Sequence, residues 1–338
     1  MREFRRVTIK DVASLAGVSV TTVSFVMNGN LSEISEETAL KVKKAAEELE
    51  YVPNIRARNF AKQKSEFIAF VIPDLNNPFY TTFAQTIIDE LDGTEYTLAI
   101  LSTNNENDNH QQIWNVLSNA TFDGAIIVSK MFDSANFREI SQNFMPFIML
   151  DEYVNEDDIP VVSNNNYLGG QLAADYLLEM NHRQIACITG PVNSPNSQLR
   201  LKGFRDKLAD YSVKICGDNI KFGDYSFESG YESARTLLAS ENGITAMFCL
   251  NDVMAMGAVR AIREKGLSVP QDISVVGYDN VNNISELSLS LTTIDQNITE
   301  MGKVAVKLLL DTINRKSSQR KKLIIQPTLV KGGSVRQL

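Results

Sequence analysis

Histidine and cysteine, two side chains that proteins often use as metal ligands and nucleophiles, are scarce in this chain of 338 residues. It contains two histidines, His110 and His182, and three widely spaced cysteines, Cys187, Cys216 and Cys249. This spacing suits neither a disulfide framework nor a metal site, and it favours reduced thiols that pack as small hydrophobic side chains. We therefore expect no metal site and no cofactor.

Sequence motifs of enzymes are also missing. The chain has no Gly-x-Gly-x-x-Gly, Gly-x-Ser-x-Gly, His-Glu-x-x-His or Cys-x-x-Cys motif and no Walker phosphate loop. An enzyme built on a nucleotide-binding sheet is one alternative for a chain of this kind, but it would need catalytic groups. We predict that the protein is not an enzyme.

Long apolar runs are absent too. No segment approaches the roughly 20 apolar residues that a membrane-spanning helix needs, and the first residues, Met-Arg-Glu-Phe-Arg-Arg, do not form an apolar signal core. The composition, 43% hydrophobic and 22% charged, is ordinary for a globular protein. We expect a cytoplasmic protein without a membrane partner.

Positive charge is concentrated at the start of the chain. Residues 1–64 carry 11 Lys and Arg against 8 Asp and Glu, a net charge of +3, whereas the whole chain has a net charge of −8. A basic amino-terminal segment on an acidic body suits contact with phosphates at one end of the protein.

The same segment has the pattern of two short helices around a tight turn. Apolar residues recur at helical spacing from Ile9 to Ala16, and Gly17 permits a sharp corner. Ser19 can then cap a second helix, in which Val23 and other valines stand three residues apart. This pattern predicts either a helix-turn-helix, whose second helix enters the DNA major groove, or an ordinary helical hairpin.

A third helix and a basic segment follow. Ser35 can cap the helix, Glu36 and Glu37 lie in its first turn, and Pro53 ends it. We expect its buried stripe to consist of Ala39, Val42, Ala46 and Leu49. The next residues, 54–64, are too poor in apolar side chains to fold alone, so we expect them to be disordered without DNA.

From residue 66 onward, short apolar runs alternate with amphipathic helices, which predicts buried parallel strands in an α/β fold. The runs are Phe67–Ile72, Tyr96–Leu101, Gly124–Val128, Phe147–Leu150, Ile185–Ile188, Ala246–Leu250 and Ile273–Gly277. A new strand and helix series after residues 160–166 favours two lobes over one large sheet. Polar residues follow several of these runs, where such sheets bind ligands.

These features together resemble the lactose-repressor (LacI/GalR) family of transcriptional regulators over essentially the whole chain. The resemblance is carried by the helix-turn-helix, by Tyr-Val-Pro-Asn at 51–54 and Arg-Ala-Arg-Asn-Phe-Ala at 56–61, and by body segments such as 162–170, 251–258 and 275–279. The body is also similar to periplasmic ribose- and galactose-binding proteins. A solute-binding protein is the rival interpretation, but it would need a secretion signal and no headpiece.

The resemblance implies a domain plan. We expect a helix-turn-helix headpiece at 1–53, a hinge helix or linker at 54–65 and an effector-binding core at 66–338. The core would have a first lobe at about 66–164 and 297–326, and a second lobe at about 165–296 and 327–338.

The resemblance also implies the residues that bind DNA. Val20, Thr21 and Phe25 would read bases, and Phe60 would wedge into the minor groove where relatives have leucine. The alternative for Phe25 is packing back onto the headpiece. Ser19, Thr22, Ser24 and Asn28 would contact phosphates, and Thr8, Arg56 and Asn59 complete the predicted set.

A sugar site between the lobes is implied in the same way, since hydroxyls need polar partners and sugar C–H surfaces need aromatic faces. The predicted effector residues are Asn77, Phe79, Tyr80, Asp151, Arg200, Tyr225, Asn251, Asp279 and Gln296. Helix caps, packing aromatic rings and a structural ion pair are the alternatives for these side chains. The Leu-Asn-Asn-Pro-Phe-Tyr stretch at 75–80 favours a ribose-like sugar, whereas Glu152 replaces the arginine of many sugar-binding relatives.

The function that follows is a homodimeric repressor that binds pseudo-palindromic operator DNA and responds to a small neutral sugar. The alternative is a regulator of the same family that senses a purine or a sugar phosphate as a corepressor.

Overall fold

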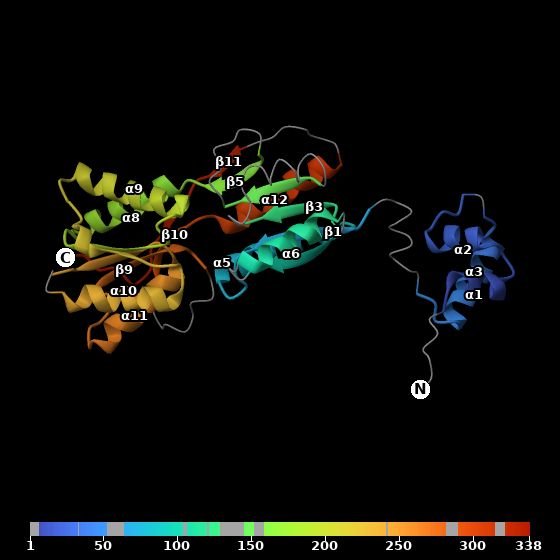
Figure 1. Ribbon diagram of the computed structural model, residues 1–338, viewed down its shortest axis with the longest axis horizontal. Helices are drawn as coiled ribbons and strands as arrows, with labels where there is room; N and C mark the ends of the chain where they lie inside the picture. The colour runs from blue at the N-terminus through green and yellow to red at the C-terminus, as the bar shows by residue number, and fades with distance from the viewer. Residues whose placement is uncertain are drawn as a thin grey trace. The chain divides into compact units, whose positions relative to one another are not determined.

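The computed structural model describes residues 7–32, 34–52, 64–103, 107–119, 122–128, 145–151, 159–240, 243–281, 290–314 and 322–338. The chain divides into two compact units, Met1–Ser65 and Glu66–Leu338. Figure 1 shows both units, and each is described by itself. Residues 54–63, for which we predict disorder without DNA, lie outside the described residues, as does Glu152.

The amino-terminal unit is built from three helices, α1 (Ile9–Ala16), α2 (Val20–Met27) and α3 (Glu36–Glu48). Val12, Val23 and Val42 are fully buried and lie in the small core that the three helices share. The chain bends by 104° between α1 and α2, which is within the usual range for a helix-turn-helix.

Local sequence signals place the ends of these helices. Gly17 adopts a left-handed φ of 67° at the end of α1, a conformation that costs glycine little. The side chains of Ser19 and Ser35 accept hydrogen bonds from backbone N–H groups and cap α2 and α3. The predicted stripe is confirmed for Ala39, Val42 and Ala46, whereas Leu49, the C-cap residue that follows α3, packs on the core but is only partly buried, and Ala45 is buried as well.

The first lobe of the second unit is a six-stranded parallel sheet in the order β11-β5-β4-β3-β1-β2. Its strands are β1 (Phe67–Ile72), β2 (Thr97–Ser102), β3 (Gly124–Ile127), β4 (Phe147–Leu150), β5 (Val161–Asn164) and β11 (Lys322–Ile325). Helices α5 (Pro78–Leu91) and α12 (Ile298–Ile313) pack on one face. Helix α6 (Asn107–Ser118) covers the other face.

The second lobe repeats this plan with the order β12-β10-β9-β8-β6-β7, in which only β12 is antiparallel to its neighbour. Its strands are β6 (Ile185–Thr189), β7 (Ile220–Phe222), β8 (Ala246–Cys249), β9 (Ser274–Asp279), β10 (Thr292–Asp295) and β12 (Thr328–Val330). Its helices are α8 (Asn166–Glu179), α9 (Pro195–Asp210), α10 (Phe227–Ala239), α11 (Asp252–Glu264) and the short 3-10 helix η1 (Gly217–Asn219). In Figure 1, α8 and α9 lie on one side of this sheet and α10 and α11 on the other.

The backbone passes between the two sheets three times, after β5, after β10 and after β11. Side chains join these passages: Asn164 Nδ2 donates to the Gln296 carbonyl at 2.9 Å, and Asn297 Nδ2 donates to the Gln326 carbonyl at 2.7 Å. Asn165 Nδ2 also donates to Gln326 Oε1 at 3.1 Å. In each sheet the strand order reverses at the first strand, between β1 and β3 in one lobe and between β6 and β8 in the other. Sheets of this kind bind ligands at the carboxyl ends of the strands beside such a reversal, so this fold favours ligand binding between the lobes.

The cysteines only partly follow the prediction. Cys187 and Cys249 are buried thiols, but Cys216 is exposed and does not pack as a small hydrophobic side chain. In the described part of the chain, no group of three or more His, Cys, Asp or Glu could hold a metal ion. Within the same ranges, no single helix has both the length and the hydropathy of a membrane span, and α1 and α2 reach them only when counted together across their bend.

Candidate functional site

Helix α2 presents the three predicted base-reading side chains on its surface. Val20 is 40% exposed and Phe25 is 41% exposed, and Thr21 is also exposed. Val23 and Val26, on the opposite face, are buried in the headpiece core. Phe25 is not part of that core, so the structure does not show the alternative in which this ring packs back onto the headpiece.

The polar side chains next to these residues form hydrogen bonds within the headpiece. Ser19 Oγ accepts from the Thr22 backbone N–H at 3.0 Å and lies 2.8 Å from the Thr22 hydroxyl. Asn28 Nδ2 donates to Ser24 Oγ at 3.3 Å. These contacts hold the two ends of α2, and each hydroxyl keeps lone pairs or a proton for a further partner.

The remaining predicted DNA contacts divide into two groups. The backbone N–H and the hydroxyl of Thr8 both donate to the Asp11 carboxylate, at 2.8 and 2.7 Å, so Thr8 closes the start of α1. Arg56, Asn59 and Phe60 lie outside the described residues.

In the second unit, Arg200 of α9 is the centre of a buried polar cluster. Its Nε donates to Asn166 Oδ1 and its Nη1 donates to the Leu250 carbonyl, both at 2.7 Å. The same Nη1 lies 3.8 Å from Asp279 Oδ1, and the guanidinium carbon lies 3.8 Å from the centre of the Tyr278 ring. With 3% of its surface exposed, Arg200 is held in place by four groups from three different segments.

Charges in this cluster are strongly coupled. Burial by itself would lower the pKa of Arg200, but Tyr278, Tyr225, Asp279 and Asp151 together raise it, so the guanidinium stays charged. Burial raises the pKa of Asp279 well above its ordinary value, although Arg200 opposes this shift. The cluster therefore favours a ligand whose polar groups donate to the carboxylates and replace lost water.

Gln296 offers an unfilled acceptor at this position. The side chain is fully buried, and its Nε2 donates to Asp279 Oδ1 at 2.6 Å. Its Oε1 has no hydrogen-bond partner among the described residues. A buried acceptor of this kind is costly unless a ligand or water donates to it, so the atom marks a point where a bound molecule would gain a hydrogen bond.

Tyr225 and Asn251 form a second part of the cluster. The Tyr225 hydroxyl lies 2.6 Å from Ser197 Oγ and 3.3 Å from Ser194 Oγ. Asn251 Nδ2 donates to the Tyr225 carbonyl at 3.0 Å, and Asn251 Oδ1 accepts from the Met254 N–H at 2.9 Å to cap α11. Asn251 therefore performs the capping role that the sequence left as an alternative, and it also holds the Tyr225 loop.

Three of the predicted effector residues have a left-handed backbone. Asp151, Tyr225 and Asp279 have φ angles of 56°, 73° and 117°. Such conformations cost residues other than glycine roughly 1–3 kcal/mol each, and they cluster at ligand sites when the surroundings enforce them. The strain supports a binding role for this region.

The first-lobe residues contribute differently from one another. Asn77 caps α5, with its Oδ1 accepting from the Phe79 N–H at 3.0 Å. Phe79 is only 4% exposed and packs edge-on against Tyr80 and Phe83, with ring centres 5.3 and 5.0 Å away. The packing alternative therefore describes Phe79 in this structure, and Tyr80 is half-buried beside it.

Asp151 connects the lobes at this point. It follows β4 of the first sheet, and its carbonyl accepts from Nδ2 of Asn196, in the first turn of α9, at 2.8 Å. Both residues are 8% exposed. The predicted first-lobe and second-lobe sides of the site are thus in direct contact.

Several members of the cluster were not predicted from the sequence. Asn164 accepts from the Tyr278 hydroxyl at 3.2 Å, and Asp252, directly after the predicted Asn251, is fully buried and accepts from the Thr293 hydroxyl at 2.6 Å. Burial raises the pKa of Asp252 to about 7, against the lowering effect of the hydrogen bond from Thr293. An acid in the first turn of a helix usually faces solvent, so no local signal distinguishes Asp252.

A helix-turn-helix unit combined with a two-lobed α/β core that buries a polar cluster is the architecture of a ligand-responsive DNA-binding regulator. Residues 8–54 match the family described as bacterial regulatory proteins, lacI family, and residues 174–335 match the periplasmic binding protein-like domain. The ribose operon repressor of Escherichia coli is 33% identical over 97% of this chain and 99% of its own length. The HTH-type transcriptional repressor PurR of Mannheimia succiniciproducens is 32% identical over 98% of this chain and 99% of its own length.

Similar solved structures also belong to lacI-family regulators. A lac repressor dimer bound to operator and the anti-inducer ONPF has 30% identity, covers 98% of this chain and 100% of its own, and superposes with a TM-score of 0.85. A lacI-family regulator from Enterococcus faecium with bound ribose has 31% identity, covers 80% of this chain and 99% of its own, and has a TM-score of 0.72. The chain therefore belongs to the lacI family of bacterial regulatory proteins. It is a DNA-binding repressor of that family, and the prediction that it is not an enzyme is confirmed by these relatives.

Proposed function

We propose that this repressor binds a pseudo-palindromic operator as a homodimer, with one α2 helix in the major groove of each half-site. The exposure of Val20, Thr21 and Phe25 on one side of α2 supports this assignment. Thr21 would hydrogen-bond a base edge, whereas Val20 and Phe25 would make apolar contacts such as those with a thymine methyl group. The operator-bound lac repressor dimer is similar to this chain over 98% of its length.

The other predicted DNA-binding residues would set the register of the complex. Thr8, Ser19, Thr22, Ser24 and Asn28 would contact phosphates, which position a protein on DNA without reading sequence. In the hinge, Arg56 and Asn59 would bind DNA and Phe60 would insert into the minor groove at the operator centre.

For the effector we propose a small neutral sugar, with ribose favoured. The observation that carries this proposal is the unfilled Oε1 of Gln296, which lies in the same buried network as Asp279 and Arg200. A sugar hydroxyl both donates and accepts, so it can give its proton to Gln296 or Asp279 and accept from Arg200. The ribose-bound relative from Enterococcus faecium supports the same choice.

The charges of the site argue against a sugar phosphate. Asp279, Asp151 and Asp252 are all buried in this region, and Arg200 is the cation that faces the first two. A phosphate group would bring its negative charge into a buried site that already raises the pKa of Asp279 and Asp252 and so opposes negative charge. We expect ribose 5-phosphate to bind more weakly than ribose.

A purine is the second candidate, because repressors named PurR are as similar to this chain as the ribose operon repressor is. The two kinds of relative have 32% and 33% identity. A purine would act as a corepressor and strengthen operator binding, whereas the proposed sugar would weaken it.

The proposed switch works through closure of the two lobes. A ligand that contacts Asp151 on the first lobe and Arg200 or Asp279 on the second would favour one lobe arrangement over another. Because the coupling is reciprocal, sugar must weaken operator binding by the same factor by which operator weakens sugar binding.

Isothermal titration of the full-length protein with ribose, other pentoses, hexoses, ribose 5-phosphate and purine bases tests this proposal. We expect ribose to bind, and Asp279→Ala to lose ribose binding while its operator affinity stays within about twofold of the wild type. Binding of a purine base without any binding of ribose, or unchanged ribose affinity in Asp279→Ala, would contradict the sugar assignment. Equal ribose affinity with and without saturating operator would contradict the coupling.

A further inference from the structure

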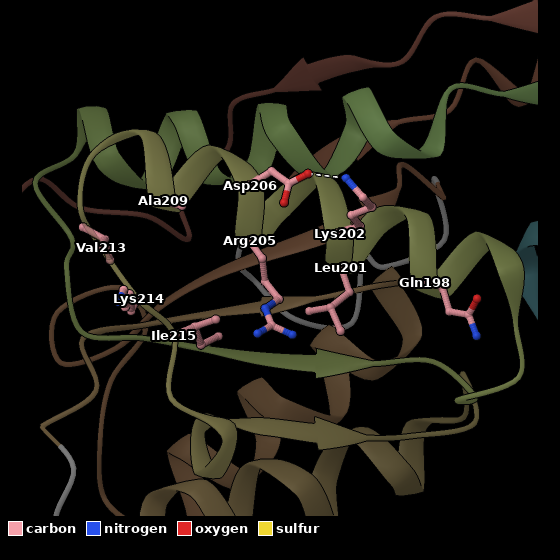
Figure 2. A pocket seen from close by; sticks show the side chains of 9 residues that line it. All are labelled: Gln198, Leu201, Lys202, Arg205, Asp206, Ala209, Val213, Lys214 and Ile215. Carbon is pink, nitrogen blue, oxygen red and sulfur yellow. Dashed lines mark hydrogen bonds and ion pairs between the residues drawn. The ribbon is translucent and has the colours of Figure 1, made fainter.

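A cavity lies on the surface of the second lobe, between α9 and the segment Val213–Ile215 that follows it (Figure 2). Its volume is about 530 Å³. It is separate from the effector cluster although α9 contributes to both. Arg205 lines the cavity, whereas Arg200 lies in the cluster. Because the two residues are five positions apart on α9, their side chains point about 140° away from each other around the helix axis.

The floor of this cavity is apolar. Leu201, Val213 and Ile215 are half-buried and pack on the hydrophobic core of the lobe, and Ala209 lies exposed at the edge. In Figure 2, Arg205 and Leu201 extend from the same side of α9. The volume lies in the range of small-molecule sites, roughly 300–1,000 Å³, and is small for a folded partner.

The polar lining of the cavity carries an excess of positive charge. Its one acid, Asp206, is paired with Lys202 and also accepts from the Tyr167 hydroxyl at 2.9 Å. The side chains of Arg205 and Lys214 are exposed and make no hydrogen bond or ion pair with any residue that the structure describes. Two cations therefore remain for a ligand beside an apolar floor.

We propose that this cavity binds a small organic anion with an apolar body and one carboxylate or similar acidic group. The planar guanidinium of Arg205 can donate two parallel hydrogen bonds to such a group, and Lys214 adds a second positive charge. The apolar body would cover Leu201 and Ile215, which removes their exposed surface from water. This site is independent of the sugar proposed for the cluster between the lobes.

Fluorescence titration of the full-length protein with 8-anilinonaphthalene-1-sulfonate, an aromatic sulfonate, tests the site. We expect Arg205→Gln to weaken binding of this probe about tenfold, the factor that loss of a charge-assisted hydrogen bond gives. Arg263→Gln, which removes an exposed arginine of α11, is the matched control and should bind within about twofold of the wild type. Equal probe affinity in the two variants would overturn the proposal.

Two further measurements test the location and the chemistry. Ala209→Phe would fill the cavity without removing a core side chain, so it should abolish binding of the probe, and retained binding would place the probe elsewhere. Octanoate should displace the probe, whereas octanol and acetate, which each have half of the proposed chemistry, should not. Displacement by octanol or acetate as effective as that by octanoate would contradict the need for both an acidic group and an apolar body.

Discussion

The contact between α8 and α9 depends on two glycines, which leads to a sharp prediction about Arg200. A Cβ at Gly170 of α8 would overlap the carbonyl oxygen of Arg200 and would lie 2.8 Å from the backbone nitrogen of Phe204. In the reverse direction, a Cβ at Gly203 of α9 would overlap the carbonyl oxygen of Tyr167. The two helix backbones therefore touch directly, and this approach sets the position of Arg200.

The cost of adding a methyl group here can be worked out from these distances. Ordinary Cβ contacts begin at 3.4 Å, so Gly170→Ala must move Phe204 away by at least 0.6 Å, and the Arg200 carbonyl farther. Overpacking of this kind costs about 1–3 kcal/mol, and the better helix propensity of alanine recovers up to about 1 kcal/mol. Because the Cβ would overlap the backbone carbonyl oxygen of Arg200, the cost lies at the upper end of this range, and we expect a net loss of about 2 kcal/mol in the free energy of unfolding of the core. The Arg200–Asn166 hydrogen bond at 2.7 Å would lengthen, because its two partners lie on the separated helices.

Urea unfolding followed by far-ultraviolet circular dichroism, at one fixed protein concentration, measures this loss. The matched control is Gly217→Ala, because a Cβ at Gly217 meets no atom within 4 Å. We expect Gly217→Ala to have the same urea midpoint as the wild type. Gly170→Ala should have a lower urea midpoint and should bind the effector more weakly. Equal midpoints for the two variants would refute the close-contact reasoning.

Three further predictions concern the DNA site, the effector cluster and a buried histidine. Phe25→Ala should weaken operator binding by about 1 kcal/mol and leave binding to random DNA unchanged, as gel-shift titrations would show; equal losses on both DNAs would argue against base contact. Arg200→Lys keeps the charge but loses the fork of donors to Asn166 and Leu250, so effector affinity should fall at least about tenfold in calorimetry, and unchanged affinity would remove Arg200 from the site. Burial lowers the pKa of His182, which lies 2.9 Å from Thr245 Oγ1, so the folded state binds fewer protons than the unfolded state and stability should fall as pH drops below about 6.5. His182→Gln should flatten this pH dependence in thermal unfolding, and an unchanged slope would contradict the assignment.

The headpiece could be predicted from the sequence almost completely, because its signals are local. Helix periodicity, the cap at Ser19 and the turn at Gly17 each act within a few residues, and the structure places all three as expected. The short apolar runs of the core likewise became strands, and most of them are buried, since such a run needs cover on both faces. The run Tyr96–Leu101 is the exception, because it forms the edge strand β2, whose residues are half-buried or exposed. The strands β5, β7, β10, β11 and β12 were not among those runs, because polar residues such as Ser163, Lys221 and Thr292 interrupt their apolar pattern.

The polar cluster shows what only the tertiary structure decided. The sequence marked Arg200, Asp279 and Gln296 as a set by resemblance, but their partners Asn166 and Asn164 lie on other segments, and Asn164 is 114 positions from the Tyr278 hydroxyl that it accepts from. Asp252 is buried because of the way α11 packs on its sheet, and Phe79 points inward because of the way α5 packs on its own. Local propensity sets where a helix begins and ends, whereas contacts between distant segments set which of its polar side chains lose water and meet each other.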